Sequence, residues 1–354
     1  MLPHFRRLVS IILLLAISST LTFAQPFRCT STATCDALVD YVSPNDTTLS
    51  AINTLFQVKN LLSILGANKL PLSTPSNFPV AAKRTIKIPF PCICNNLTGI
   101  SNRQPNYTVV PGDYLYHIAA EVFAGLVTVQ QIQEVNNIAN ASLISVGQKL
   151  WIPLPCSCDD VDGQKVLHYG YVVPAGSSVE GIAQQYNTSR DTLLRLNNLT
   201  SPNDLKADAI LDVPLRACSS EVRNTSQDYP LLVPNGTYVF TANNCVRCNC
   251  EAANNWILQC ESSSLINSSC RPVQCEGQEN FYLGNTSFSG CNRRTCAYAG
   301  YNLQNILTTL DLQSTCPASS SIGLQGSRWN FLLISIHVML ICLPFLKRVA
   351  IFLM

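Results

Sequence analysis

The sequence predicts an α+β protein of three small βααβ units tied by disulfides, followed by a Cys-rich domain of loops and strands. A strand–helix–helix–strand pattern recurs three times, about 65 residues apart. The chain has 17 cysteines and an N-terminal secretion signal, the usual setting of a disulfide framework. Because each unit is too small to bury a large core, we expect covalent ties between units to stabilise the protein.

The clearest unit spans residues 107–153. Its first four residues favour a strand, and a Pro-Gly-Asp turn follows, with Asp113 placed to N-cap the first helix. Thr128 is the expected N-cap of the second helix, and residues 149–153 are the expected closing strand. Apolar residues at helical spacing support both helices: Leu115, Ile118, Ala119 and Val122, then Val129, Ile132 and Val135.

The first copy, residues 36–90, is more divergent. It opens with a candidate strand, and the Thr47-Thr48 pair can cap the helix that follows. A second helix over residues 58–65 ends at Gly66, which we place at the C′ position. Residues 85–89 then predict the closing strand.

The third copy, residues 169–214, repeats the strand and turn of the second. Ser177 or Ser178 is the expected cap of its first helix, and Thr188 or Ser189 that of its second. Residues 209–214 predict its closing strand.

Cysteines flank these units and continue beyond them. Two Cys-x-Cys motifs lie between the units and two cysteines precede the first, and these six allow fifteen pairings. A zinc site is disfavoured because the compartment is oxidising and no histidine stands at ligand spacing. Residues 218–316 are loop-rich with short strand signals at 231–233 and 238–240, and hold Cys218, Cys245, Cys248, Cys250, Cys260, Cys270, Cys275, Cys291, Cys296 and Cys316.

Both termini carry targeting signals. Residues 1–24 have the basic start, apolar run and small-residue cleavage site of a signal peptide. Residues 317–354 form a polar spacer and an apolar tail, the pattern of a GPI-attachment signal, with Ser319 or Ser320 as the attachment residue. The rival interpretation is a single transmembrane helix over residues 331–346, stopped by Lys347-Arg348.

The composition argues against nucleic acid as a partner and is typical of a secreted glycoprotein. The net charge is only +2 and no basic stripe is visible, which argues against nucleic acid. Charged residues make up 12% of the chain, so the surface is built for hydrogen bonding and glycosylation. Ten N-glycosylation sequons fit passage through the secretory pathway, at Asn45, Asn96, Asn106, Asn140, Asn187, Asn198, Asn224, Asn235, Asn267 and Asn285.

The signal peptide, the three units joined by Cys-x-Cys motifs, the Cys-rich region and the GPI signal together resemble the plant LysM domain-containing GPI-anchored receptor-like proteins, which include chitin-elicitor-binding proteins. Residues 63–68, 240–246 and 297–301 look most like the branch that perceives bacterial peptidoglycan. The resemblance implies disulfides between Cys29 and Cys94, Cys35 and Cys158, and Cys92 and Cys156.

The resemblance also implies a glycan-binding groove in the second unit, between the loop after its first strand and the loop after its second helix. Val129 and Leu143 match apolar contact positions of family chitin sites, although the residues alone favour a core role for both. Asn140 lies in the second loop within a sequon, so an attached glycan could narrow the groove. The residues implied are Pro111, Gly112, Asp113, Tyr114, Tyr116, Val129, Asn136, Asn140 and Leu143.

We therefore expect a plasma-membrane receptor without cofactor or metal that binds N-acetylglucosamine-containing microbial glycans. Peptidoglycan is the first ligand and chitin oligosaccharide the alternative. Signalling would pass through a transmembrane LysM receptor-like kinase, with a possible homo- or hetero-oligomer of related LysM proteins. An enzyme is disfavoured because the acidic residues of 218–316 single out no catalytic pair. A structural wall-anchoring protein is the third alternative.

Overall fold

The structure is a computed structural model that describes residues 27–30, 32–95, 97–265, 270–303, 305–314 and 316. Two compact units divide the chain: Met1–Ser287 with Arg294–Asp311, and Phe288–Arg293 with Leu312–Met354. Within the ranges described, no helix is long and apolar enough to cross a membrane. The predicted features that lie outside these ranges are the signal peptide, the sequons at Asn96 and Asn267, the GPI-attachment signal with Ser319 and Ser320, and the rival transmembrane helix over residues 331–346.

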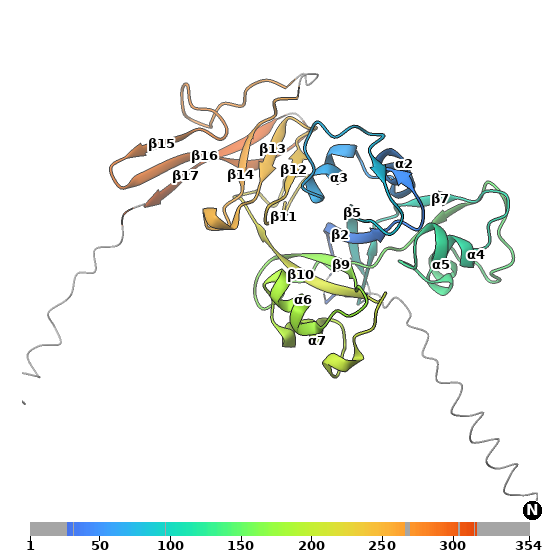
Figure 1. The fold of residues 1–354 in the computed structure, drawn as a ribbon. Coiled ribbons are helices and arrows are strands. Elements are labelled where there is room, and N and C mark those ends of the chain that lie inside the picture. The colour runs from blue at the N-terminus through green and yellow to red at the C-terminus, as the bar shows by residue number, and fades with distance from the viewer. Residues whose placement is uncertain are drawn as a thin grey trace, which may run out of the picture. The chain divides into compact units, whose positions relative to one another are not determined.

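A seven-stranded sheet joins the first and third βααβ segments (Figure 1). Strand β2 pairs antiparallel with β5 along its whole length, and parallel with β9 through Leu38↔Tyr169 and Val39↔Gly170. The two segments thus share one sheet. In sheet order the strands are β1 (Phe27–Arg28), β6 (Thr98–Ser101), β5 (Thr85–Asn95), β2 (Ala33–Val42), β9 (Val166–Val172), β10 (Ile210–Cys218) and β11 (Val233–Pro234).

The first segment carries helices α2 (Leu49–Phe56) and α3 (Leu61–Ala67), with the small strands β3 (Thr47–Thr48) and β4 (Pro79–Val80) beside them. Thr48 caps α2 as predicted. The prediction that Gly66 ends the second helix at C′ is wrong, because α3 runs through Gly66 to its C-cap, Asn68. A Cβ on Gly66 would clash with the backbone carbonyl oxygen of Tyr238, so the glycine permits a close approach of β12 (Tyr238–Thr241).

The second segment has its own two-stranded sheet, β7 (Asn106–Thr108) with β8 (Lys149–Trp151), both shorter than predicted. Its first helix is α4 (Leu115–His117), which continues as a π-helical turn over Ile118–Val122. Its second is α5 (Val129–Val135), where Thr128 and Gln131 form a capping box. The predicted N-cap role of Asp113 is wrong: Tyr114 holds that position, without a side-chain bond.

The third segment contains α6 (Val179–Tyr186) and α7 (Arg190–Leu196), followed by a 3-10 turn, Pro202–Asp204. Ser178 caps α6 and Ser189 caps α7, each through its hydroxyl oxygen. Its apolar side chains form a cluster of their own around Tyr169, Val179 and Leu193.

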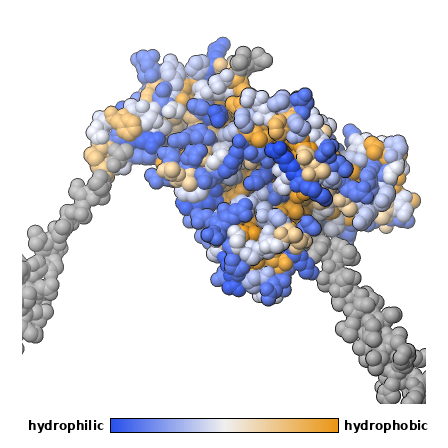
Figure 2. Space-filling model, in the orientation of Figure 1, coloured by the Kyte–Doolittle hydropathy of each residue, from blue (hydrophilic) through white to orange (hydrophobic). Residues whose placement is uncertain are grey.

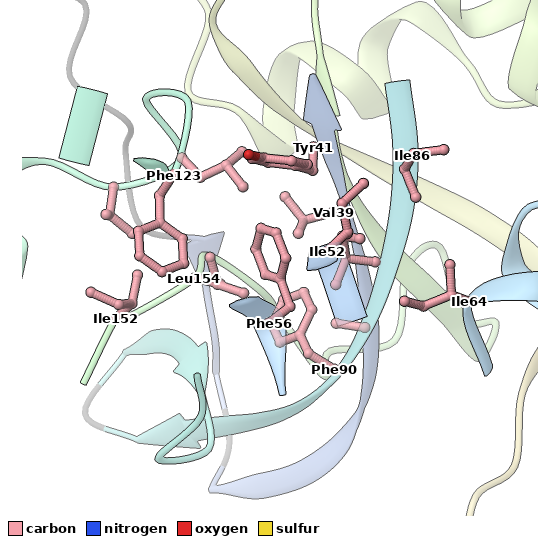
Figure 3. Close-up of a cluster of buried hydrophobic side chains, with 14 of the residues drawn as sticks. Val39, Tyr41, Ile52, Phe56, Ile64, Ile86, Phe90, Phe123, Ile152 and Leu154 are labelled. Carbon is pink, nitrogen blue, oxygen red and sulfur yellow. The ribbon is translucent and has the colours of Figure 1, made fainter. Parts of the chain in front are cut away.

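A single core spans the first and second segments (Figure 3). The ring of Phe56 from α2 meets Tyr41 edge-on at 5.0 Å and Phe123 of the second segment at 5.6 Å. Ile152 and Leu154 close the same cluster from the chain after β8. Because aromatic edge contacts of this kind add to simple area burial, the second segment is packed firmly on the first.

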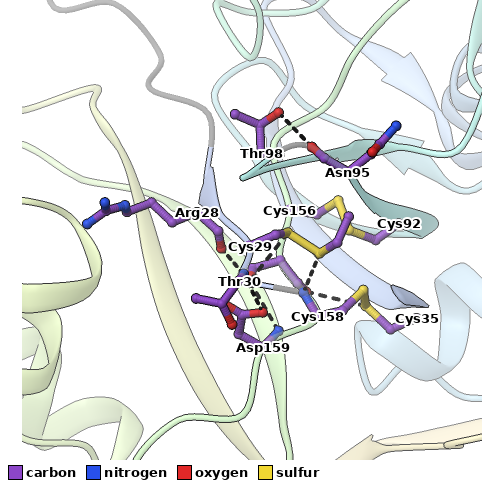
Figure 4. The surroundings of a disulfide bond; sticks show 12 residues. Arg28, Cys29, Thr30, Cys35, Cys92, Asn95, Thr98, Cys156, Cys158 and Asp159 are labelled. Carbon is purple, nitrogen blue, oxygen red and sulfur yellow. Dashed lines mark hydrogen bonds between the residues drawn. A yellow bond between two sulfur atoms is a disulfide. The ribbon is translucent and has the colours of Figure 1, made fainter. Parts of the chain in front are cut away.

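Three disulfides reinforce the three segments (Figure 4). They join Cys29 to Cys94, Cys35 to Cys158 and Cys92 to Cys156, the pairs that the family resemblance implies. Beside them, Asp159 accepts hydrogen bonds from the backbone N–H of Thr30 at 2.9 and 2.8 Å.

The Cys-rich region forms two small sheets. One contains β12, β13 (Val246–Asn249) and β14 (Gln259–Ser262), and the other β15 (Thr286–Ser289), β16 (Asn292–Tyr301) and β17 (Ile306–Ser314). A short 3-10 turn, Ala252–Asn254, lies between β13 and β14. The disulfides here are Cys218–Cys250, Cys245–Cys270, Cys248–Cys260, Cys275–Cys296 and Cys291–Cys316.

Candidate functional site

An asparagine at the end of the second helix clamps that helix to the closing strand in all three βααβ segments. Asn68, Asn136 and Asn197 each donate from Nδ2 to the carbonyl oxygen four residues back and to a carbonyl oxygen of the closing strand. Each Oδ1 accepts the N–H of that same strand residue, and the nine distances lie between 2.7 and 3.0 Å. The strand partners are Lys87, Trp151 and Asp212.

This clamp explains Asn136, which the family resemblance implied as a ligand contact. Both Nδ2 hydrogens are used within the segment, so the side chain positions the loop after α5. Sequence reasoning missed the equivalent roles of Asn68 and Asn197. The Asn-Asn pairs at 136–137 and 197–198 were the available signal, and the divergent first segment lacks the second asparagine.

Asp113 organises the loop that follows β7. Its Oδ2 accepts the backbone N–H of Val110 at 2.8 Å and the Tyr107 hydroxyl at 2.9 Å, while Oδ1 lies 2.8 Å from Nδ1 of His117. The Asp113 side chain is only 1% exposed, so it shapes the turn from inside. This local bond reaches back three residues to the backbone N–H of Val110, and it replaces the N-cap bond that we predicted.

The pKa shifts of Asp113 and Tyr107 fit the hydrogen bonds between them. Burial works to raise the pKa of the Asp113 carboxyl, but the hydrogen bonds from Val110, Tyr107 and His117 outweigh it and leave the pKa lowered. Burial and the neighbouring Asp113 raise the pKa of the Tyr107 hydroxyl to about 12. At neutral pH the tyrosine therefore stays protonated and donates to an ionised Asp113.

Two loops emerge from the same end of the small β7–β8 sheet. Thr108, the last residue of β7, pairs with Lys149, the first of β8. Just beyond them, Val109 donates to the carbonyl oxygen of Gln148 and accepts from Gly147, at 2.9 and 2.8 Å. The loop after β7 and the loop before β8 are consequently held side by side at their bases.

These loops present exposed apolar side chains, which we call the apolar loop surface. Figure 2 shows exposed apolar residues on the face over α4 and α5. The rings of Tyr114 and Tyr116 stack at 6.4 Å with their planes 8° apart. The surface consists of Val110, Tyr114, Tyr116, Leu143 and Val146, which are 48%, 53%, 62%, 70% and 65% exposed.

The equivalent loops of the other two segments lack this feature. Residues 33–95 and 169–214 are fully described, and no large hydrophobic side chain within them is exposed. Exposed apolar side chains on two loops whose bases lie side by side make this surface a candidate binding site. Val110 and Val146 belong to it although sequence reasoning did not select them.

The remaining predicted site residues occupy different positions. Val129 is half-buried and packs against the core, so only part of its side chain is exposed. Pro111 and Gly112 are exposed at the tip of the first loop, where Gly112 has a φ of +92° and open space around it. Asn140 is exposed in the second loop, and its Oδ1 accepts the N–H of Ser142 at 2.9 Å.

Metal-ligand chemistry has little support in the part of the chain that the structure describes. Among the described residues, the one cluster of three possible ligand atoms is that of Cys35, Cys92 and Cys158, whose sulfur atoms lie within 4.8 Å of one another. All three sulfurs are bonded in disulfides, so they offer no thiolate to zinc.

Comparison with known proteins agrees with the observed elements. The LysM domain family model matches residues 107–153 and 171–214. "LysM domain-containing GPI-anchored protein 2" of Arabidopsis thaliana is 47% identical over 95% of this chain and 96% of its own length. "Chitin elicitor-binding protein" of Oryza sativa subsp. japonica is 41% identical over 91% and 92% of the two chains.

A receptor kinase shares part of the same sequence. "Chitin elicitor receptor kinase 1" of Physcomitrium patens is 28% identical over 52% of this chain and 28% of its own length. The two relatives above cover nearly the whole chain at more than 40% identity, and they share its LysM regions. This chain belongs to the family of LysM domain-containing GPI-anchored proteins.

Proposed function

We propose that the protein is a cell-surface receptor that binds N-acetylglucosamine-containing microbial glycans through the apolar loop surface of residues 107–153. That surface is the observation that carries the proposal, because an N-acetylated sugar offers a methyl group and apolar ring faces. Tyrosine and aliphatic side chains suit these, and exposed loop backbone can pair with the amide. The membership of the chain in a LysM family supports this assignment.

Some residues of this region are proposed to contact the glycan, and others to hold the loops in place. Tyr114, Tyr116 and Leu143 are the proposed main contacts, with Val110 and Val146 beside them, because these side chains are exposed. The backbone at Pro111 and Gly112 is open to the sugar amide. Asp113 and Asn136 act as positioning residues, since their polar atoms are bonded within the segment.

Bacterial peptidoglycan is our first choice of ligand, and chitin oligosaccharide is the second. Both present β-1,4-linked N-acetylated sugars, so the same loops can accept either. The chitin candidate is favoured by the rice relative, whose name states that it binds a chitin elicitor. The peptidoglycan candidate rests on the resemblance of residues 63–68, 240–246 and 297–301 to the peptidoglycan-perceiving branch.

The remaining parts of the proposal concern architecture and signalling. The first segment is a third LysM unit, because Asn68 makes the same clamp as Asn136 and Asn197. The protein acts without catalysis, is held at the membrane by a GPI lipid on Ser319 or Ser320, and signals through a transmembrane LysM kinase. The kinase relative that matches half of this chain supports that kind of partner.

Calorimetry of the mature protein against chitin oligomers and soluble peptidoglycan fragments tests the proposal. Leu143→Asp places a charge on the apolar loop surface, and we expect at least about tenfold weaker binding, equivalent to about 1.4 kcal/mol. Leu97→Asp is the matched control, because Leu97 is 72% exposed against 70% for Leu143 and lies outside both loops. Unchanged affinity for Leu143→Asp, or heat from neither ligand, would remove this surface as the site.

Glycosylation at Asn140 provides a second test of the same surface. Leu143 donates its backbone N–H to the carbonyl oxygen of Asn140 at 2.9 Å, so a glycan there stands next to the proposed contact. We expect Asn140→Gln to bind fragments more tightly, whereas Asn187→Gln, a sequon of the third segment, should not change the affinity. Equal affinities for all three proteins would show that position 140 does not obstruct the surface.

A further inference from the structure

The smaller compact unit contains a strand tip that is covalently tied to the chain leading toward the C-terminus. This unit comprises Phe288–Arg293 together with Leu312–Met354. Cys291, in the turn between β15 and β16, is bonded to Cys316, with their Cα atoms 5.1 Å apart. The tip and the end of β17 therefore move as one body.

Two large apolar side chains are exposed on this unit. Phe288 on β15 is 70% exposed and Leu312 on β17 is 64% exposed. Both β15 and β17 are edge strands of the β15-β16-β17 sheet. Exposed apolar residues on edge strands are a liability for a soluble protein unless something covers them. Figure 2 shows exposed apolar atoms over this part of the chain.

The proposed lipid attachment site lies close to these side chains along the chain. Ser319 and Ser320 follow Cys316 by three and four residues. At about 3.5 Å per extended residue, the attachment residue lies at most about 10–14 Å of chain from the disulfide. Because the disulfide ties the tip to the same chain, an anchored protein would keep the tip within the combined length of this chain and the glycan of the anchor from the bilayer surface.

We propose that the β15–β16 tip is a membrane contact, in which Phe288 and Leu312 insert among the lipids at the headgroup boundary. An aromatic and an aliphatic side chain suit that boundary, where apolar groups leave water. A bilayer is a better occupant than a second copy of the chain. The tether keeps the bilayer constantly within reach, whereas a second copy must first be encountered. This inference rests on the lipid-anchoring part of the proposed function and not on glycan binding.

Tryptophan quenching in vesicles tests the proposal. The mature protein, isolated with its lipid and reconstituted in phosphatidylcholine vesicles, carries either Phe288→Trp or the control Leu97→Trp, whose parent residues are 70% and 72% exposed. We expect lipids brominated near the headgroup to quench the added emission of Phe288→Trp and not that of Leu97→Trp. The parent protein supplies the background from its native tryptophans.

The disulfide and the anchor are tested in the same system. Cys291→Ser with Cys316→Ser, added to Phe288→Trp, should reduce the quenching because the tip is no longer tied to the anchored chain. If brominated lipid does not quench the emission of the tryptophan at position 288, the proposal is overturned. If aqueous acrylamide also fails to quench that emission, a second copy of the chain covers the tip instead of the bilayer. Treatment of the vesicles with phosphatidylinositol-specific phospholipase should release the protein. If the protein stays on the vesicles, the premise that a GPI lipid anchors it is wrong. Calorimetry with glycan fragments decides the receptor proposal separately.

Discussion

Asp40 is a buried acid that should make the stability of the shared sheet depend on pH. It lies on β2 and is only 2% exposed. Its Oδ1 accepts the Tyr169 hydroxyl at 2.5 Å, and its Oδ2 accepts the N–H of Val172 at 3.3 Å. Lys87 of β5, whose ammonium lies 4.9 Å from the centre of the Tyr169 ring, is the nearby cation.

Burial dominates these contacts and raises the pKa of Asp40 to about 6, although the bonds from Tyr169 and Val172 and the charge of Lys87 oppose the shift. The ordinary value is 3.8, so the difference of about 2 units corresponds to about 3 kcal/mol. Between pH 4 and pH 6 the folded protein holds a proton that the unfolded chain releases. The free energy of unfolding therefore falls as the pH rises through that window.

Asp40→Asn is the perturbation, because asparagine resembles the protonated acid in shape and carries no charge. We expect the free energy of unfolding of the variant to equal that of the parent protein near pH 3.5. By pH 7 it should exceed the parent value by up to about 3 kcal/mol. Denaturant unfolding with intact disulfides, followed by tryptophan fluorescence at several pH values, measures both proteins. A stability difference that stays constant across that range would refute the reasoning.

Two further predictions concern the stability of the fold, one through packing and one through a buried ion pair. Gly66→Ala should lower the free energy of unfolding by about 1–3 kcal/mol, since its Cβ would meet the carbonyl of Tyr238. Gly181→Ala, in α6, brings a Cβ to 3.2 Å from the Ser178 hydroxyl, a contact with a side chain and not with backbone, so it should cost less than Gly66→Ala in the same denaturation assay. Burial opposes the charged form of His168, but Asp212, 2.9 Å from its Nδ1, outweighs burial and raises its pKa. Its stabilising charge is therefore fully present below the ordinary pKa of 6.5 and lost as the pH rises through the raised pKa, so His168→Gln should cost about 3–5 kcal/mol at pH 6 and less at pH 9 in denaturant unfolding.

The sequence allowed the local features of the fold to be predicted. Thr48, Thr128, Ser178 and Ser189 cap the four helices they were expected to cap, because a cap bond involves only residues three apart. The loop-rich nature of the Cys-rich region followed in the same way from its composition. Hydrophobic periodicity placed the elements of the second segment to within a few residues.

Features set by distant parts of the chain could not be predicted. The parallel pairing of β2 with β9 joins segments about 130 residues apart, and no pattern within either strand specifies it. Gly66 looked like a helix end because its true constraint, the backbone of Tyr238, lies far along the sequence. Val110 and Val146 of the apolar loop surface were missed for a similar reason: only the folded loops show that both side chains are exposed.

The Cys-rich region also explains why the second segment, and not the first, has open loops. The loop after α3 is the counterpart of the loop that carries Leu143. The Tyr238 hydroxyl of β12 donates to the carbonyl oxygen of Leu70 in that loop at 2.6 Å, and at the other end of α3 its N-cap, Asn60, donates to Asn244 at 3.1 Å. Tyr238 thus holds the loop after α3 in the first segment. The same asparagine clamp builds both loops, so the contact with β12, and not the clamp, distinguishes the loop of the first segment from that of the second.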